Sequence, residues 1–223
     1  MATKQNHAKR ILIVDDHPVL RKGLARLIEL NDGFEVCGEA ADAAEAVTLM
    51  KSLKPDLVMV DLVLPGESGI ALTKRIRTEF PKLPVLVLSM HDEPLYASRA
   101  LRAGAMGYIA KQDAIDHILT ALRCVLNGER YLSPGIAKGA LLNSGSDGAE
   151  LKSDDPTNVL SDRELEILDL LGRGHEVREI AAKLQLSSKT IETHRTHIKE
   201  KLNLKNARQV AHFAVRWIDR EGP

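Results

Sequence analysis

The stretch that most constrains the fold is an apolar run that ends in a single acid, Leu57–Gly69, with the sequence LVMVDLVLPGESG. Branched apolar residues without alternation, closed by Pro65 and Gly66, are typical of a buried strand in a parallel sheet. Asp61 then lies at the carboxyl end of that strand, the edge at which open α/β sheets bind ligands. A single aspartate at this position is explained by a turn or a helix cap. A second acid at the same edge of the sheet is needed to indicate a functional site.

A second strand supplies such acids. The run RILIVDD, residues 10–16, is also apolar and ends in Asp15 and Asp16. If both strands belong to one parallel sheet, three carboxylates meet and raise one another's pKa unless a cation lies among them. Oxygen ligands with room for water and a phosphate suit Mg²⁺ better than Ca²⁺ or Zn²⁺. We therefore predict a Mg²⁺ site formed by Asp16, Asp61 and the main-chain carbonyl of Val63, with Asp15 acting through water.

The first 127 residues alternate between strand-like and helix-like patterns. Strands are expected at residues 10–16, 34–40, 57–61, 85–89 and 107–111. Helices are expected at residues 18–28, 43–53, 68–80, 94–103 and 113–127, with Val19 and Ile115 on their apolar faces. Five βα units in series predict an α/β fold, a five-stranded, doubly wound parallel sheet with right-handed crossovers.

Two more polar residues fall at the same sheet edge, because Ser89 ends the fourth expected strand and Lys111 ends the fifth. An acid nucleophile, a cation, a hydroxyl and an ammonium group together suit a phosphoryl group that is accepted and then held. We predict that Asp61 attacks the phosphorus and that Ser89 and Lys111 then bind the acyl phosphate.

These residues resemble those of a two-component receiver domain, which is a flavodoxin-like fold. The match comprises the acid pair Asp15 and Asp16, Asp61 with Pro65 and Gly66, Ser89, and the run GYIAK that ends at Lys111. The resemblance implies that a sensor histidine kinase phosphorylates Asp61, and that Ser89 and Tyr108 form a switch pair. A core aromatic is the alternative for Tyr108. Many receivers have a cis proline after the lysine, whereas this chain has Gln112, so a cis peptide is not assumed.

Beyond residue 127 the alternation stops. Residues 128–158 are expected to be a linker with one short helix after Pro134, since NSGSDGAELKSDDPTN is rich in Ser, Gly and Asp. Residues 159–223 are expected to form four helices, the first opened by a capping box of Ser161 and Glu164 and the third capped by Ser187. Two short helices joined by a tight turn predict a helix-turn-helix.

The last segment is similar to the LuxR-type DNA-binding domain through LSDRELEILDLL and EIAAKLQLSSKTIETHRTHIKEKL. Together with the receiver, it identifies the chain as a response regulator of the NarL/FixJ type that binds double-stranded promoter DNA. Positions in the motif imply base contacts by Glu192, Thr193 and Thr196. Contacts to the DNA backbone are expected from Lys189, Thr190, Arg195, Lys199 and Lys201.

The last expected helix presents one apolar face, formed by Val210, Phe213, Ala214 and Trp217. Core packing explains part of this face. The resemblance implies that another part pairs two DNA-binding domains, so that the chain acts as a dimer once it is phosphorylated.

Composition excludes several classes of function. Acidic and basic residues balance at 31 each, and aromatic residues make up only 3% of the chain, which argues against a stacking platform for single-stranded nucleic acid. The two cysteines fit no metal or disulfide spacing. No apolar run approaches the roughly 20 residues of a membrane helix, and the polar N-terminus resembles no signal peptide. A cytoplasmic protein without membrane contact is expected.

Two other functions compete with a phosphorylation-controlled regulator. A phosphatase that passes through an aspartyl phosphate would need a second acid two residues beyond Asp61, where Val63 stands. No enzyme activity is therefore expected beyond self-phosphorylation and slow dephosphorylation. A constitutive DNA-binding protein, whose receiver dimerises without phosphate, is the alternative. The expected partners of the regulator are the kinase, promoter DNA and a second copy of the chain, with RNA polymerase as a further candidate.

Overall fold

The computed structural model describes residues 8–90, 94–137 and 156–221. The chain forms two compact units, residues 1–147 and 148–223. Most of the predicted linker, residues 138–155, lies outside the described residues, and the predicted domain boundaries at 127 and 158 stay predictions. Within the described ranges, no helix is both long enough and apolar enough to cross a membrane.

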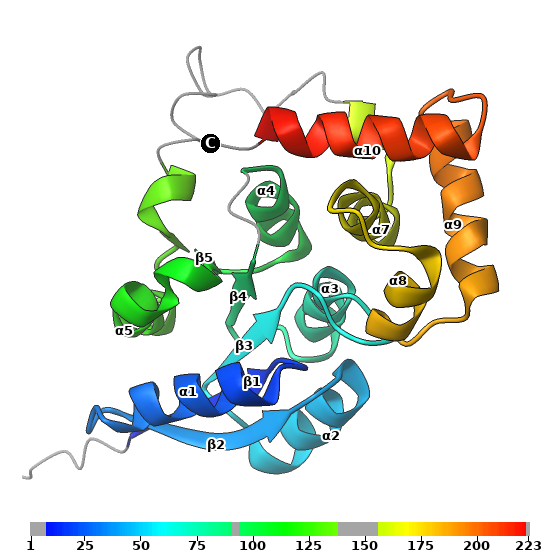
Figure 1. Cartoon of the computed structure of the whole chain (residues 1–223). Helices are drawn as coiled ribbons and strands as arrows, with labels where there is room; N and C mark the ends of the chain where they lie inside the picture. The colour runs from blue at the N-terminus through cyan, green and yellow to red at the C-terminus, as the bar shows by residue number, and fades with distance from the viewer. Residues whose placement is uncertain (1–7, 91–93, 138–155, 222–223) are drawn as a thin grey trace, which may run out of the picture. The chain divides into compact units, whose positions relative to one another are not determined.

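The first unit is a parallel sheet with helices on both faces (Figure 1). Its strands are β1 (Lys9–Val14), β2 (Phe34–Ala40), β3 (Leu57–Asp61), β4 (Val85–Ser89), β5 (Gly107–Ala110) and β6 (Tyr131–Leu132). Its helices are α1 (Pro18–Glu29), α2 (Ala43–Leu53), α3 (Gly69–Glu79), α4 (Pro94–Ala103) and α5 (Ala114–Leu126), and residues 134–137 are also helical. The strand order is β2-β1-β3-β4-β5-β6 and every pair is parallel. The predicted doubly wound α/β architecture is confirmed.

The sheet has one strand more than predicted. The two residues of β6 pair with β5, Tyr131 opposite Gly107 and Leu132 opposite Tyr108. The prediction of five strands is therefore wrong by one, and it placed this strand in the linker. A two-residue strand is too short to show any periodicity, which is why the sequence pattern did not indicate it.

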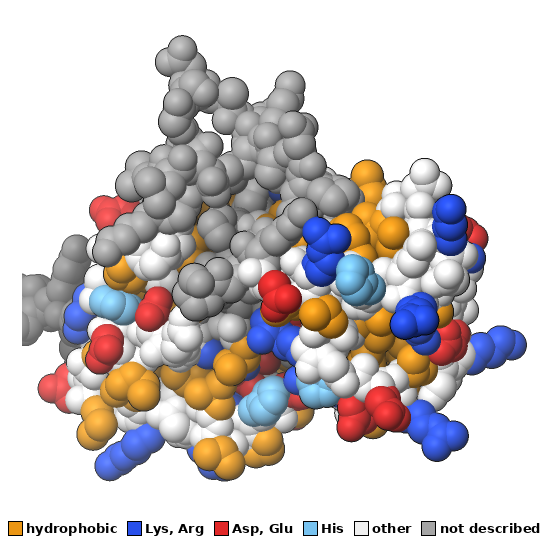
Figure 2. Space-filling model, turned by 45° about the horizontal axis from the view of Figure 1, so that its top comes forward, with side chains coloured by type: hydrophobic (Ala, Val, Ile, Leu, Met, Phe, Trp, Pro, Cys, Tyr) orange, Lys and Arg blue, Asp and Glu red, His pale blue; other side chains and the backbone are white. Residues whose placement is uncertain are grey.

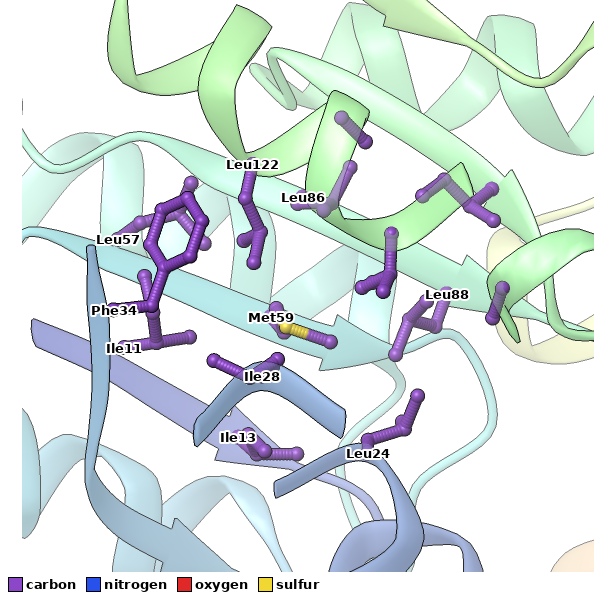
Figure 3. Close-up of a cluster of buried hydrophobic side chains, with 14 of the residues drawn as sticks. Ile11, Ile13, Leu24, Ile28, Phe34, Leu57, Met59, Leu86, Leu88 and Leu122 are labelled. Carbon is purple, nitrogen blue, oxygen red and sulfur yellow. The ribbon is translucent and has the colours of Figure 1, made fainter. Parts of the chain in front are cut away.

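The apolar core on one face of the sheet joins the strands to α1 and α5. Figure 3 shows Ile13 and Met59 of the sheet facing Ile28 of α1, with Leu122 of α5 beside them. All four side chains are fully buried. The alternate strand residues Leu12, Val58 and Val60 are fully buried as well. Burial on both faces of the sheet explains why the strands are continuous apolar runs in the sequence.

Two residues predicted on the buried helix faces are instead exposed. Val19 is 88% exposed and Ile115 is 74% exposed. Each is the second residue of its helix, α1 or α5. Helical periodicity assigns a residue to a face, but it does not tell how far along the helix that face is covered.

The second unit is helical throughout its described part. It contains a 3₁₀ turn η2 (Pro156–Val159) and the helices α7 (Asp162–Gly172), α8 (Val177–Lys183), α9 (Ser188–Lys201) and α10 (Ala207–Glu221). The predicted capping box is present, since Ser161 accepts from Glu164 N–H and the Glu164 side chain accepts from Ser161 N–H. Ser187 caps α9 as predicted.

The turn between α8 and α9 is tight because Gln185 takes the left-handed conformation, with φ of 51°. Its N–H donates to the carbonyl of Ala182, and the N–H of Leu186 donates to Ala181. These bonds end α8 within one turn and let α9 begin at Ser188. The geometry is that of a helix-turn-helix.

Gly69, the first residue of α3, fixes how closely that helix approaches the end of β3. A Cβ atom at Gly69 would lie 2.0 Å from the carbonyl oxygen of Asp61. We expect Gly69→Ala to lower the free energy of unfolding by about 2–3 kcal/mol, because main-chain atoms must move to admit the methyl group. Urea denaturation measures the change.

Gly23→Ala is the matched control, because Gly23 lies inside α1 and a Cβ atom there would meet no neighbouring group within 4 Å. Alanine favours a helix over glycine, so this variant should gain about 0.5–1 kcal/mol. Equal effects of the two substitutions would contradict the close approach at Gly69.

Candidate functional site

Three acids and one lysine meet at the carboxyl edge of the sheet. Asp15 and Asp16 follow β1, Asp61 ends β3, and Lys111 follows β5. The Nζ atom of Lys111 lies 2.7 Å from Oδ2 of Asp61 and 2.8 Å from Oδ2 of Asp15. Asp15, Asp61 and Lys111 are buried. The structure thus brings together residues that are up to 96 positions apart in the sequence.

The charges in this pocket do not balance. Burial raises the pKa of Asp61 to about 7, and Lys111 opposes this rise while Asp15 adds to it. Burial works to lower the pKa of Lys111, but the carboxylates of Asp61 and Asp15 hold it above its usual value. One ammonium group among three carboxylates leaves a negative pocket, which favours a further cation.

The donor set fits a hard divalent cation. Carboxylate oxygens of Asp15, Asp16 and Asp61 and a nitrogen of His17 all lie within 4.8 Å of one another. The main chain at Val63 passes beside the pocket, since its N–H lies 3.4 Å from Oδ1 of Asp61. An acidic pocket of this kind is typical of a Mg²⁺ site.

His17 and Arg21 belong to the pocket although the sequence did not indicate it. The Nδ1 atom of His17 lies 2.7 Å from Oδ1 of Asp16. Arg21 donates to the main-chain carbonyl of Asp15 and pairs with Glu39 at 3.0 Å. The position of His17 directly after two acids is the only sequence signal that could have found it.

Ser89 and Tyr108 lie on β4 and β5, on the side of β3 away from β1. Ser89 ends β4 opposite Ala110, and Tyr108 of β5 pairs with Val87. Both side chains are fully buried. The described residues contain no cis peptide bond, so the Lys111–Gln112 bond is trans.

Helix α9 presents the three predicted base-contacting side chains to solvent. Glu192, Thr193 and Thr196 are all exposed. The hydroxyl of Thr193 donates to the carbonyl of Lys189, and that of Thr196 donates to the carbonyl of Glu192, each at 3.0 Å. The hydroxyl hydrogens are therefore used within the helix, which leaves the methyl groups and oxygen lone pairs for a partner. Glu192 also pairs with Arg195 at 2.7 Å.

The residues predicted to contact the DNA backbone differ in their exposure and in their ion pairs. Lys189 is exposed, whereas Thr190, Arg195 and Lys199 are partly buried. The Nζ atom of Lys201 lies 2.6 Å from Oε2 of Glu164, so Lys201 already forms an ion pair with a residue of α7. On the face shown in Figure 2, Lys and Arg side chains are dispersed among acidic and apolar ones, in keeping with the net charge of zero.

The predicted dimer face of α10 is mostly core. This helix packs on α7 and α9, and Val210, Ala214 and Trp217 are buried. Of the four predicted residues only Phe213 is partly exposed, and the neighbouring Val215 is 44% exposed. Core packing therefore accounts for three of the four.

Two family models match the chain. The model described as the response regulator receiver domain matches residues 11–123. The model described as bacterial regulatory proteins of the luxR family matches residues 158–214. The two matches cover the two compact units separately.

Full-length relatives are also found. The oxygen regulatory protein NreC of Staphylococcus carnosus is 39% identical over 212 residues, which cover 93% of this chain and 97% of the relative. NreC of Staphylococcus aureus strain RF122 is 40% identical over the same shares.

Solved structures agree with these relatives. A LuxR-family response regulator from Aurantimonas is 41% identical, with a TM-score of 0.59 over 60% of this chain and 96% of that one. A structure of two RcsB dimers bound to two parallel DNAs is 28% identical, with a TM-score of 0.59 over 93% of this chain and 98% of that one.

Proposed function

This chain belongs to the two-component response regulators that join a receiver domain to a LuxR-type DNA-binding domain, and from that premise we propose that phosphorylation of Asp61 controls its binding to promoter DNA. The family regulates transcription by binding DNA and is not a class of enzymes. The observation that carries the proposal is the Lys111 ammonium, which lies within 2.8 Å of both Asp61 and Asp15.

The two oxygens of Asp61 have different surroundings, which indicates the attacking atom. Oδ2 is held by Lys111 at 2.7 Å, whereas the main-chain N–H of Val63 lies 3.4 Å from Oδ1. Oδ1 is therefore the less engaged oxygen, and we assign the attack to it. A bond forms between Oδ1 and phosphorus while the bond from phosphorus to the histidine nitrogen of the kinase breaks.

The residues around Asp61 hold the product. Lys111 would move from Asp61 Oδ2 to an oxygen of the phosphoryl group, and the Ser89 hydroxyl would donate to a second oxygen. Asp16, Asp61 and the carbonyl of Val63 would hold Mg²⁺, with Asp15 acting through water, and the ion neutralises phosphoryl oxygens when bound. Movement of Ser89 and the buried Tyr108 would carry the change to the surface of the receiver.

The kinase and the second copy of the chain would use exposed apolar side chains. Val19, next to the pocket on α1, is 88% exposed, so we assign kinase docking to this end of the helix. The RcsB structure contains DNA-bound dimers, and we propose that this chain also binds DNA as a dimer. In the DNA-binding domain, Phe213 is the predicted α10 residue that stays partly exposed, so we assign pairing to its side of the helix.

We propose that α9 enters the major groove. Glu192, Thr193 and Thr196 would contact bases, while Lys189, Thr190, Arg195, Lys199 and Lys201 would contact the DNA backbone. The exposed capped helix after a tight turn supports this assignment. Contact with RNA polymerase stays a prediction.

A binding-site selection from random duplex DNA tests the base contacts. We expect the double substitution Thr193→Ala and Thr196→Ala to change the selected sequence, because each lost base contact costs about 1–3 kcal/mol. Lys199→Ala should weaken binding to all sequences alike and reduce the salt dependence. The same selected sequence from the double variant and from the wild type would contradict the assignment of α9.

A further inference from the structure

Outside the receiver pocket, one other group of metal-ligating side chains lies close together among the described residues, formed by Glu164, His194 and His197. Glu164 is the third residue of α7, and the two histidines are three positions apart on α9, so they share one side of that helix. The candidate ligand atoms all lie within 4.8 Å of one another. We propose that these residues bind a divalent transition-metal ion, with Zn²⁺ as the best match, and thereby fasten the recognition helix α9 to α7.

Glu164 can serve as a ligand without losing its role as a helix cap, because its two oxygens face different groups. Oε2 accepts from the N–H of Ser161 at 2.7 Å and from Lys201 at 2.6 Å. Oε1 faces Nδ1 of His197 at 3.8 Å. The bonds to Oε2 hold the carboxylate in a fixed orientation, as outer contacts do in metal sites.

The two histidines supply what a transition metal needs. Nδ1 of His194 is buried and has no hydrogen-bond partner among the described residues. A buried polar nitrogen without a partner is costly, and a bound ion would satisfy it. The side chain of His197 is 50% exposed, so an ion can reach the site from solvent.

The chemical types of the three ligands indicate which metal ion the site would bind. Two imidazoles and one carboxylate match three-ligand zinc sites that keep a fourth position for water, whereas Mg²⁺ prefers oxygen ligands. Ligands on a tetrahedral zinc ion lie about 3.4 Å apart, so the side chains would close by about 1 Å. Lys201 also contacts Glu164 and repels a second cation. The affinity should therefore be lower than that of structural zinc sites.

Calorimetric titration of the full-length protein with Zn²⁺, in excess Mg²⁺ to occupy the receiver pocket, tests the site. We compare the wild type with His197→Asn and with His212→Asn, which replaces an exposed histidine on α10. The wild type and His212→Asn should bind one Zn²⁺ that His197→Asn binds at least about 100-fold more weakly. Zn²⁺ should also raise the melting temperature of the wild type and of His212→Asn, but not that of His197→Asn.

Two results would overturn the proposal. One is wild-type zinc affinity and stoichiometry in His197→Asn. The other is an equal loss in His212→Asn, which would indicate non-specific binding to surface histidines. Both readouts are independent of the phosphorylation of Asp61, so failure of this proposal would leave the proposed function intact.

Discussion

Replacing Asp61 with asparagine is expected to abolish phosphorylation completely. After incubation with Mg²⁺ and acetyl phosphate, intact mass should show one phosphoryl adduct on the wild type and none on Asp61→Asn. The amide is nearly the same size as the carboxylate but lacks the charged oxygen that attacks phosphorus. Size-exclusion chromatography of both samples should show a shift toward dimer for the wild type alone.

Asp32→Asn is the control for this experiment, because Asp32 is an exposed aspartate outside the pocket. This variant should carry the adduct like the wild type. An adduct on Asp61→Asn would place the acceptor elsewhere. Absence of an adduct on the wild type, with DNA binding intact, would favour the alternative in which the receiver dimerises without phosphate.

DNA binding is measured with the wild type and with Asp61→Asn. Phosphorylation adds about two negative charges to a buried site, which is enough to shift an equilibrium between two receiver conformations. We expect acetyl phosphate to raise the DNA affinity of the wild type and to leave that of Asp61→Asn unchanged. Equal affinities with and without the phosphodonor in the wild type would contradict phosphorylation control.

The sequence was sufficient to predict the positions of Asp61 and Lys111, because two rules combine there. An apolar run that stops at a polar residue marks the end of a buried strand, and parallel strands place their carboxyl ends at one edge. Neither rule needs knowledge of side-chain rotamers. The same is true of Ser161 and Glu164, whose capping box depends only on a spacing of three residues.

The features that sequence reasoning missed depend on three-dimensional contacts without a local pattern. His17 meets Asp16 only through the path of the chain into α1. Glu164 and Lys201 are 37 residues apart and meet because α7 and α9 pack together. Val19 falls on the apolar face of α1 by periodicity, but it lies at the start of the helix, which the core does not cover. Periodicity predicts which face of a helix is apolar, but packing decides which residues of that face are buried.

Replacing Lys111 with methionine is expected to destabilise the receiver, and by more as the pH rises. Methionine leaves the buried carboxylates of Asp15 and Asp61 without their cation, which costs about 3–5 kcal/mol when both are ionised. At low pH, protonation of Asp61 relieves most of this cost. Urea denaturation at pH 6, 7 and 8 measures the difference from the wild type.

The direction of the pH dependence follows from the pKa of Asp61. Burial raises this pKa to about 7 in the folded protein, far above the value near 4 of an unfolded chain. The folded state therefore holds this proton more tightly, and the contribution of Asp61 to stability falls as pH rises from about 4 to about 7. Lys111 limits the rise of this pKa, so without Lys111 the fall continues above pH 7. The gap between Lys111→Met and the wild type should widen there by up to about 1.4 kcal/mol per pH unit.

Lys9→Met is the control for Lys111→Met, because Lys9 is half-exposed and its contact with Asp56 is 3.5 Å long. An exposed pair contributes at most about 1 kcal/mol and should show little change between pH 6 and 8. Added Mg²⁺ should restore part of the stability of Lys111→Met at pH 8, since a divalent cation can replace the missing ammonium group among the carboxylates. A gap that is the same at pH 6 and pH 8 would contradict the role of Lys111 as the cation that keeps Asp61 ionised and ready to attack.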